Sequence, residues 1–209
     1  MTICSVSIAP VLTAKISAHE RIMVAAYGLF SRRGIRNVSV DEVIALSGVA
    51  KATLYRHFPS KDDLVLAFLA RREREWTYGL VAAGAIERSA DPVGRLLAVF
   101  DVFHDWFQRD DFEACSFVNV LLELGPDHPA GRASIGYLAN VRSLIARFAE
   151  AAGLREPEEF ARSWHILMKG SIVQAAQGDL RAAQRSKGMG ELLIAQHSVA
   201  QHSVAQHGA

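Results

Sequence analysis

The chain has 209 residues, of which 50% are hydrophobic and 22% are charged, and its formal net charge is +1. This composition supplies enough apolar side chains for a packed core and excludes an intrinsically disordered chain. No apolar run reaches the roughly 18 residues of a membrane-spanning helix, so no membrane partner is expected. The two cysteines, Cys4 and Cys115, form no disulfide framework and suit the reducing cytoplasm, where the protein is expected to act.

The charges are distributed unevenly along the chain. Residues 15–75 contain 11 Lys and Arg against 7 Asp and Glu, whereas the remainder contains 12 against 15. A basic N-terminal third on an acidic body is typical of a protein that meets phosphate groups at one end. The asymmetry is modest, so it supports a nucleic-acid partner only together with a binding motif.

Two helices are predicted in the first 48 residues. Apolar residues at helical spacing predict a helix over 18–33, which Gly34 ends. Ser39 and Glu42 have the spacing of a capping box for a second helix, and a turn follows at Gly48. The buried side of the second helix is expected to consist of Val40, Val43, Ile44 and Leu46.

Further helices are predicted along the rest of the chain, and the fold class is all-α. A third helix over 50–57 must end before Pro59, and Ser60 caps a fourth that runs to about residue 83. The sequence AQHSV is repeated over 195–209, which predicts a low-complexity tail. The remaining helices are expected over 92–109, 112–123, 129–152, 157–177 and 179–195.

The second and third helices have the pattern of a helix-turn-helix that binds DNA. Leu54 and Phe58 are spaced to pack the third helix, the recognition helix, onto its neighbours. The other side of this helix is then free to enter the major groove. The expected base contacts are Lys51, Ala52 and Thr53, and the expected phosphate contacts are Tyr55, His57 and Lys61.

The segment GVAKATLYRHFPSKDDLV resembles the pattern GVSKGTLYxHFPSKExL of the TetR family of one-component regulators. The resemblance implies a DNA-binding domain with a connecting helix over 18–83 and an effector and dimerisation domain over 84–195. From their composition, residues 1–17 are expected to form a flexible arm and residues 196–209 the low-complexity tail. The resemblance also places five of the expected DNA contacts on the family's contact positions, namely Lys51, Thr53, Tyr55, His57 and Lys61. Ala50 departs from the family pattern, which has a serine that caps the recognition helix; losing such a cap costs about 1 kcal/mol.

Aromatic residues are clustered in the predicted effector domain. Most of them fit an ordinary core, and some fit the wall of a cavity for a small hydrophobic effector. The segment 112–129 resembles GCxFxNAxxE…DHP of one TetR branch, which names no ligand. The candidate ligand-binding residues are Phe103, Trp106, Phe107, Phe117, Leu121, Trp164 and Met168.

The resemblance implies a homodimer through the helices over 157–177 and 179–195, bound to a palindromic double-stranded operator. Two recognition helices about 34 Å apart then enter successive major grooves. The function that this resemblance implies is that of a repressor, which a small molecule releases from DNA. An activator, or a helical sensor that does not bind DNA, remains an alternative.

No motif of catalysis or metal binding accompanies these features. The sequence has no paired catalytic carboxylates, GxSxG, phosphate loop or HExxH, so no enzyme activity and no cofactor are expected. Three tail histidines, His197, His202 and His207, recur five residues apart, whereas helical metal pairs favour a spacing of four. Cys115 lies among apolar residues and is interpreted as a small buried hydrophobe.

Overall fold

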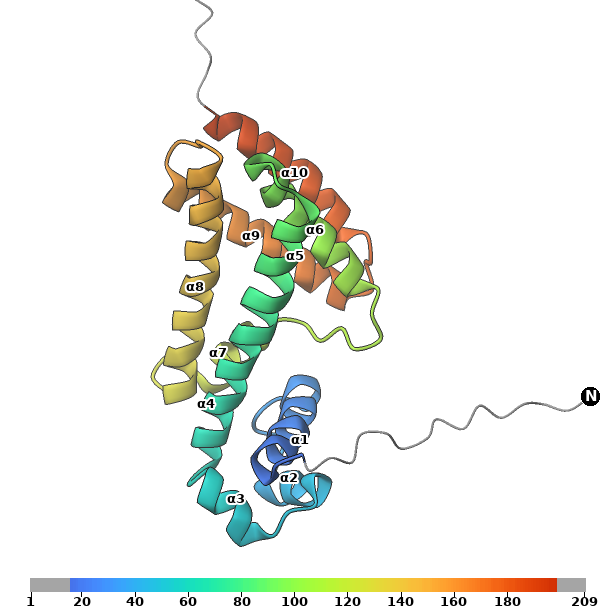
Figure 1. The fold of residues 1–209 in the computed structure, drawn as a ribbon, viewed down its shortest axis with the longest axis vertical. Helices are drawn as coiled ribbons and strands as arrows, with labels where there is room; N and C mark the ends of the chain where they lie inside the picture. Colours follow the sequence, from blue (N-terminus) through green and yellow to red (C-terminus); the bar gives the residue numbers. More distant parts are fainter. Residues whose placement is uncertain (1–15, 199–209) are drawn as a thin grey trace, which may run out of the picture. The chain divides into compact units, whose positions relative to one another are not determined.

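The computed structural model describes residues 16–198, and every regular element in that range is a helix (Figure 1). The all-α prediction is therefore confirmed for this part of the chain. Most of the predicted arm over 1–17 and of the predicted tail over 196–209 lies outside the described residues. The chain divides into two compact units, the first ending at Leu64 and the second beginning at Val65. The predicted boundary was at residues 83 and 84.

The first unit contains α1 (Ala18–Arg33), α2 (Val40–Ser47) and α3 (Lys51–His57), and both α2 and α3 pack against α1. The helix bounds agree with the sequence prediction to within one residue. On α2, Val43 is buried, but Leu46 is 63% exposed, so its predicted burial is wrong. The reason is helical geometry: the buried stripe continues from Val43 to Ser47, four residues on, and leaves Leu46 on the outer side.

The predicted ends of these helices are confirmed by their hydrogen bonds. The Ser17 hydroxyl accepts a bond from the Glu20 amide at the start of α1. The Ser60 hydroxyl accepts one from the Asp63 amide, and the Asp63 carboxylate accepts one from the Ser60 amide. Between α2 and α3, Gly48 has φ +63°, in the left-handed region that a side chain disfavours.

The predicted fourth helix is three consecutive helical segments. They are α4 (Lys61–Arg72), the π-helical η1 (Glu73–Ala82) and α5 (Ala83–Arg88). The wider winding of η1 is visible at Ala83, whose amide reaches back to the carbonyl of Tyr78, five residues earlier. Helical structure thus extends five residues beyond the predicted end at residue 83. Apolar spacing does not distinguish a π segment from an α segment, so the sequence did not indicate it.

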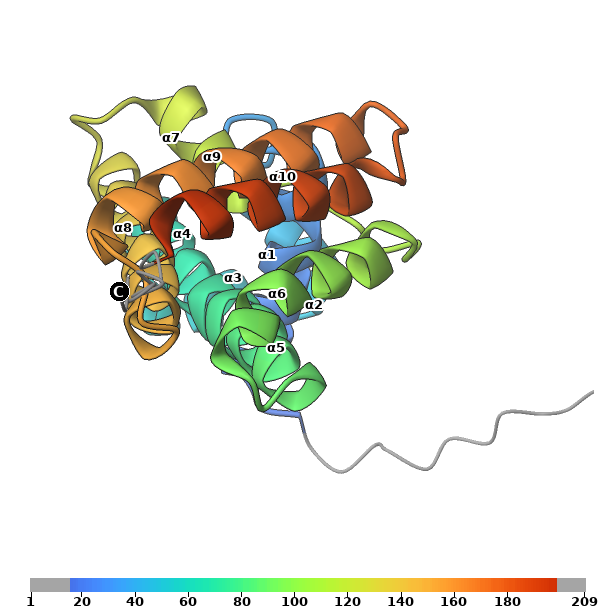
Figure 2. The same ribbon diagram turned by 90° about the horizontal axis from the view of Figure 1, so that it is seen from above.

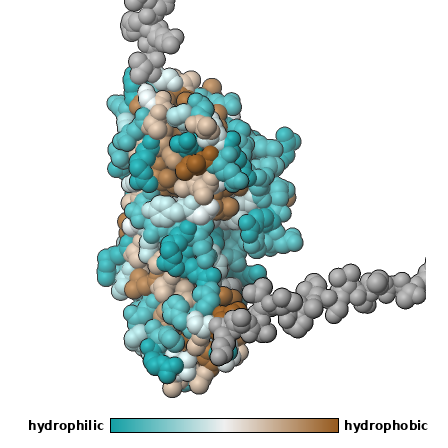
Figure 3. Space-filling view, viewed as in Figure 1, coloured by the Kyte–Doolittle hydropathy of each residue, from teal (hydrophilic) through white to brown (hydrophobic). Residues whose placement is uncertain are grey.

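The second unit also contains α6 (Pro92–Phe107), α7 (Ser116–Leu124), α8 (Pro129–Ala151), α9 (Pro157–Ala176) and α10 (Ala182–His197). The helix α8 packs on α6, α7 and α9, and α6 packs on α10. Figure 2 shows α9 and α10 side by side, joined by the turn over 177–181. The face shown in Figure 3 is mostly hydrophilic, with small apolar areas.

In the second unit, the starts of two helices differ most from the predictions. The helix α7 begins at Ser116 and not at 112, and α10 begins at Ala182 and not at 179. At its other end α10 continues to His197, into the predicted tail. His197 is held there because its carbonyl accepts a bond from the Arg155 amide (2.8 Å) and its ring contacts Phe160 (centroids 5.4 Å apart). The other two tail histidines lie outside the described residues.

Candidate nucleic-acid interface

The recognition helix α3 presents polar side chains on one side and apolar side chains on the other. Leu54 is completely buried and Phe58 is 5% exposed, as the sequence predicted. Lys51, Ala52, Tyr55, Arg56 and His57 are exposed, and Thr53 is half-buried. Ala50 supplies no side-chain hydrogen bond to the start of α3, as expected for the missing serine.

Three of the predicted contact residues already have partners within the first unit. The Lys51 ammonium lies 3.4 Å from the Asp41 carboxylate on α2. The Lys61 ammonium donates to the Ile35 carbonyl at 2.6 Å, so this side chain also ties the start of α4 to the loop after α1. The His57 ring lies edge-on to His19 of α1, with centroids 5.7 Å apart. Both lysines are therefore tied to partners within the first unit.

The structure adds residues of α1 that the sequence reasoning missed. His19 contacts both His57 and Phe58, the latter with ring centroids 5.1 Å apart. Arg21 reaches the Gly48 carbonyl at the turn before α3, at 3.5 Å. Both residues therefore support the position of α3. No local motif predicted these contacts, because each joins residues 27 or more positions apart in the sequence.

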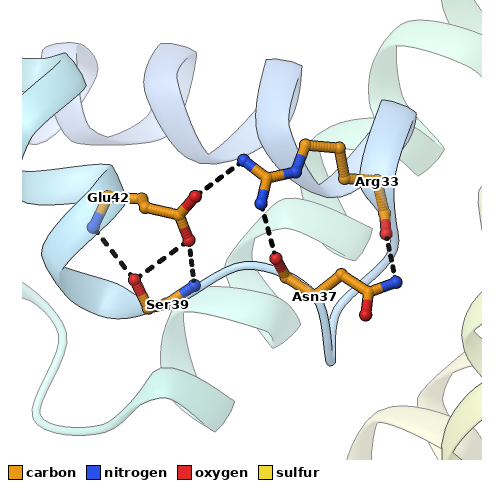
Figure 4. Close-up of polar contacts among 4 residues, drawn as sticks. All are labelled: Arg33, Asn37, Ser39 and Glu42. Atoms are coloured by element: carbon orange, nitrogen blue, oxygen red, sulfur yellow. Dashed lines mark hydrogen bonds and ion pairs between the residues drawn. The ribbon is translucent and has the colours of Figure 1, made fainter.

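A polar cluster joins the end of α1 to the start of α2 (Figure 4). Arg33 donates to the Glu42 carboxylate at 2.7 Å and to the Asn37 carbonyl at 2.8 Å. The Ser39 amide donates to the same carboxylate at 2.7 Å, and the Glu42 amide donates to the Ser39 hydroxyl at 3.2 Å. This completes the predicted capping box. The cluster fixes the loop that carries Ile35, the partner of Lys61.

The same cluster makes the first unit sensitive to acid. The bond from the Ser39 backbone, followed by the bond from Arg33, lowers the pKa of Glu42 from 4.5 to about 2. A lowered folded-state pKa contributes stability above pH 4.5 that is lost as the pH falls toward 2. We expect Glu42→Gln to remove this part of the acid dependence, measured as urea unfolding by far-UV circular dichroism between pH 5 and about 2. Glu87→Gln, an exposed glutamate of α5, is the control; equal acid dependence in both variants would contradict the prediction.

The predicted ligand-binding residues lie in the second unit. Leu121 is half-buried and the other six are buried. Phe103, Trp106 and Phe107 are in mutual ring contact, with centroids 5.7 Å apart in each pair. Phe117 joins this cluster through Trp76 of η1, which contacts Phe103, Trp106 and Phe117. The sequence reasoning missed Trp76.

Trp164 and Met168 belong to another part of the same core. Trp164 stacks on Phe160 at 5.1 Å and contacts Phe100 at 5.0 Å, and Met168 is completely buried. A cavity of about 680 Å³ is lined by residues of α9, α10 and the turn between them, and none of the seven candidate residues lines it. The role of the seven residues in ligand binding therefore stays a prediction.

Across residues 16–198 there is no group of three or more His, Cys, Asp or Glu side chains placed to hold a metal ion. Among the helices of that range, none has the length and apolar character needed to cross a membrane.

Comparison with known proteins places these features in context. Residues 22–68 match the family described as bacterial regulatory proteins, tetR family. The HTH-type transcriptional activator FasR of Mycolicibacterium smegmatis is 33% identical over 90 residues, which cover 43% of this chain and 40% of FasR. The uncharacterized HTH-type transcriptional regulator Rv1255c of Mycobacterium tuberculosis is 27% identical over 158 residues, covering 75% of this chain and 74% of that protein. The crystal structure of SCO4454, a TetR-family transcriptional regulator from Streptomyces coelicolor, superposes with a TM-score of 0.80 at 27% identity, covering 87% of this chain and 96% of that one.

Proposed function

We propose that this chain, which belongs to the TetR family of transcriptional regulators, is a homodimeric repressor released from a palindromic operator by a small molecule. The observation that carries the proposal is the two-sided recognition helix. Leu54 and Phe58 anchor α3, and its outer side presents Lys51, Tyr55 and His57. A short helix held in this way places donors where the major groove offers base edges and phosphates.

The roles of the six DNA contacts follow from their positions on α3 and α4. Lys51, Ala52 and Thr53 lie in the first turn of α3, the part that lies nearest the bases in a helix-turn-helix. Tyr55, His57 and Lys61 are proposed to contact phosphates, which fixes the register without reading sequence.

A second copy of the chain is the proposed partner of α9 and α10. These helices expose Ile166 (72%), Val173 (52%), Met189 (55%) and Leu192 (74%). Large apolar side chains gathered on two adjacent helices are typical of a protein–protein interface. A two-fold dimer formed there would offer two recognition helices to the two halves of a palindrome.

The effector is proposed to bind the second unit, with Phe103, Trp106, Phe107, Phe117, Leu121, Trp164 and Met168 as candidates for its contacts. It releases DNA only if it binds the DNA-incompetent arrangement more tightly. The boundary between the two units falls inside α4, so a movement of this helix is the proposed link between effector and α3.

We expect Tyr55→Ala and Thr53→Ala to weaken DNA binding in different ways. Thr53→Ala should lose about 1 kcal/mol of discrimination at one base pair, the value of a single hydrogen bond, whereas Tyr55→Ala should weaken binding about equally for all sequences. The measurement is fluorescence anisotropy on duplexes that the protein selects from a random pool, compared with single-base variants of them. Tyr78→Ala is the matched control, because Tyr78 is 44% exposed, like Tyr55 at 40%, but lies on η1.

Two results would contradict this proposal. The first is a folded dimer that selects no duplex at low salt, which would favour the sensor without DNA binding. The second is unchanged affinity and discrimination in both α3 variants. Because FasR, which is similar over 90 residues, is an activator, a reporter gene behind the selected operator determines the sign of regulation.

A further inference from the structure

A cavity of about 310 Å³ with an apolar wall opens on the surface of the first unit, between α1 and α2. Its wall includes Ile16, Val24 and Leu46, whose side chains are 58%, 56% and 63% exposed. Single exposed apolar side chains are common on proteins, but three that line one cavity are typical of a surface that another segment covers. The described part of the chain, residues 16–198, leaves this cavity uncovered.

The segment that precedes this cavity in the sequence is apolar and nearly uncharged. Segments that stay unfolded in water are typically poor in apolar residues and rich in charge. Arms that bind nucleic acid are typically basic, whereas the first 15 residues contain one charged residue, Lys15. The composition therefore favours a segment that packs on protein. Nine of these 15 residues are hydrophobic, namely Met1, Ile3, Cys4, Val6, Ile8, Ala9, Val11, Leu12 and Ala14.

This segment joins the described chain at the wall of the cavity itself. Ile16 lines the cavity and directly precedes Ser17, the N-cap of α1. An extended chain spans at most about 3.6 Å per residue, so Leu12 is tethered within roughly 15 Å of Ile16. The apolar run over 8–12, IAPVL, is therefore close enough to cover the cavity. A tethered segment meets its site at a high effective concentration, so weak contacts are enough to hold it there.

The cavity adjoins the turn that precedes the recognition helix. Arg21 lines the cavity, and its guanidinium donates to the Gly48 carbonyl at 3.5 Å. Leu46 lies two residues before this glycine, near the end of α2. A segment that covered the cavity would shield the bond between Arg21 and Gly48 from water, and hydrogen bonds are stronger where the local dielectric is low. Such a segment would therefore help to hold the turn before α3.

We propose that residues 8–12 fold back onto this cavity, with Leu12 against Leu46, and form a packed part of the first unit. This differs from the flexible arm that composition alone led us to expect. The proposed dimer uses α9 and α10, so the second copy is assigned to another surface. The inference goes beyond the function proposed above and depends on neither DNA nor an effector.

Disulfide cross-linking in the full-length protein tests this placement. Leu12→Cys and Leu46→Cys are combined with Cys4→Ser, and oxidation is followed by intact mass and by electrophoresis without reductant. The matched control has Ala45→Cys in place of Leu46→Cys, because Ala45 is exposed on the same helix and does not line the cavity. Cys115, which is 7% exposed, is kept. We expect the Leu46 pair to oxidise about 10-fold faster than the control pair, within one chain, because a docked segment holds the two sulfurs together.

Three results of the cross-linking would overturn the proposal. Equal rates in the two pairs would show that the segment does not dock on the cavity. A disulfide between two chains would show that a second copy covers the cavity. The absence of oxidation in both pairs would show that residue 12 does not reach α2.

Thermal unfolding tests whether the docked segment stabilises the first unit. Leu12→Asp places a charge among apolar side chains and should lower the onset of the circular dichroism transition by about 4–8 °C, as for a small domain that loses one partly buried leucine. Thr13→Asp, at the next position, is the control and should leave the onset unchanged. Leu46→Asp should act like Leu12→Asp, and the double variant should lose no more than either single one, because the two side chains share one contact.

An unchanged onset in Leu12→Asp, or losses that add in the double variant, would contradict the contact between Leu12 and Leu46. Neither measurement involves DNA, so failure of the proposed regulator function would leave both results unaffected.

Discussion

Replacing Leu54 with alanine is expected to destabilise the first unit by about 2–5 kcal/mol and to abolish DNA binding at temperatures that the parent tolerates. Leu54 is completely buried in α3, which packs on α1 and α2. α3 has only 7 residues and no side-chain cap, so it is too short to be stable without this packing. Loss of the anchor therefore removes the orientation of Lys51 and Thr53 along with the stability.

The effect can be measured for the first unit alone. Trp76, Trp106 and Trp164, the 3 tryptophans of the chain, all lie in the second unit, whereas the circular dichroism signal comes from the helices of both. In Leu54→Ala we expect the dichroism transition to begin at a lower temperature than the tryptophan fluorescence transition. Leu122→Ala, at a position that is 79% exposed, is the control and should change neither. A Leu54→Ala protein with unchanged unfolding and full DNA affinity would refute the assignment of α3.

The helix-turn-helix was predictable because its signals are local. Each of three serine hydroxyls accepts a hydrogen bond from the amide three residues later, at Ser17, Ser39 and Ser60. Two helices end at glycines with positive φ, Gly34 and Gly48. Such spacings can be recognised from sequence without knowledge of the fold. The wrong prediction of burial at Leu46 shows the limit of local signals. Adjacent helical positions differ by about 100° of rotation, so the apolar character of Leu46 did not reveal that Ser47, and not Leu46, lies on the buried side.

The second unit was less predictable because its notable contacts join residues that are far apart in the sequence. Apolar spacing on α9 selects Trp164 and Met168, which are core residues with 0% exposure. His165 and Lys169 lie one residue further along. Lys169 contacts Cys115 and Trp76, which are distant in sequence and belong to parts of the chain whose packing no local pattern reveals.

The second unit is expected to lose stability as the pH falls below 6.5, because His165 is buried as a neutral ring. Its pKa is about 3 in the folded protein and 6.5 as an ordinary value. Between these values the unfolded chain binds a proton that the folded chain does not, so acid favours unfolding. As with a lowered carboxylate pKa, stability falls as the pH falls. For His165 this loss of stability begins at pH 6.5, two pH units above the value of 4.5 at which it begins for Glu42. The slope is roughly 1.4 kcal/mol per pH unit, which amounts to about 3 kcal/mol near pH 4.5.

Tryptophan fluorescence during urea unfolding measures this loss where it arises, since all three tryptophans belong to the second unit. His165→Phe replaces the ring by one that cannot be protonated and should flatten the dependence between pH 6.5 and 4.5. Burial is the largest cause of the shift and Lys169 the next, so Lys169→Met should raise the folded-state pKa only in part. In Lys169→Met the loss of stability would then begin at the same pH as in the parent, because the pKa of the unfolded chain is unchanged. It would be complete at a higher pH than in the parent. If His165→Phe and the parent show parallel curves over this range, His165 is not the group that titrates. If Lys169→Met removes the dependence entirely, repulsion and not burial keeps the ring neutral.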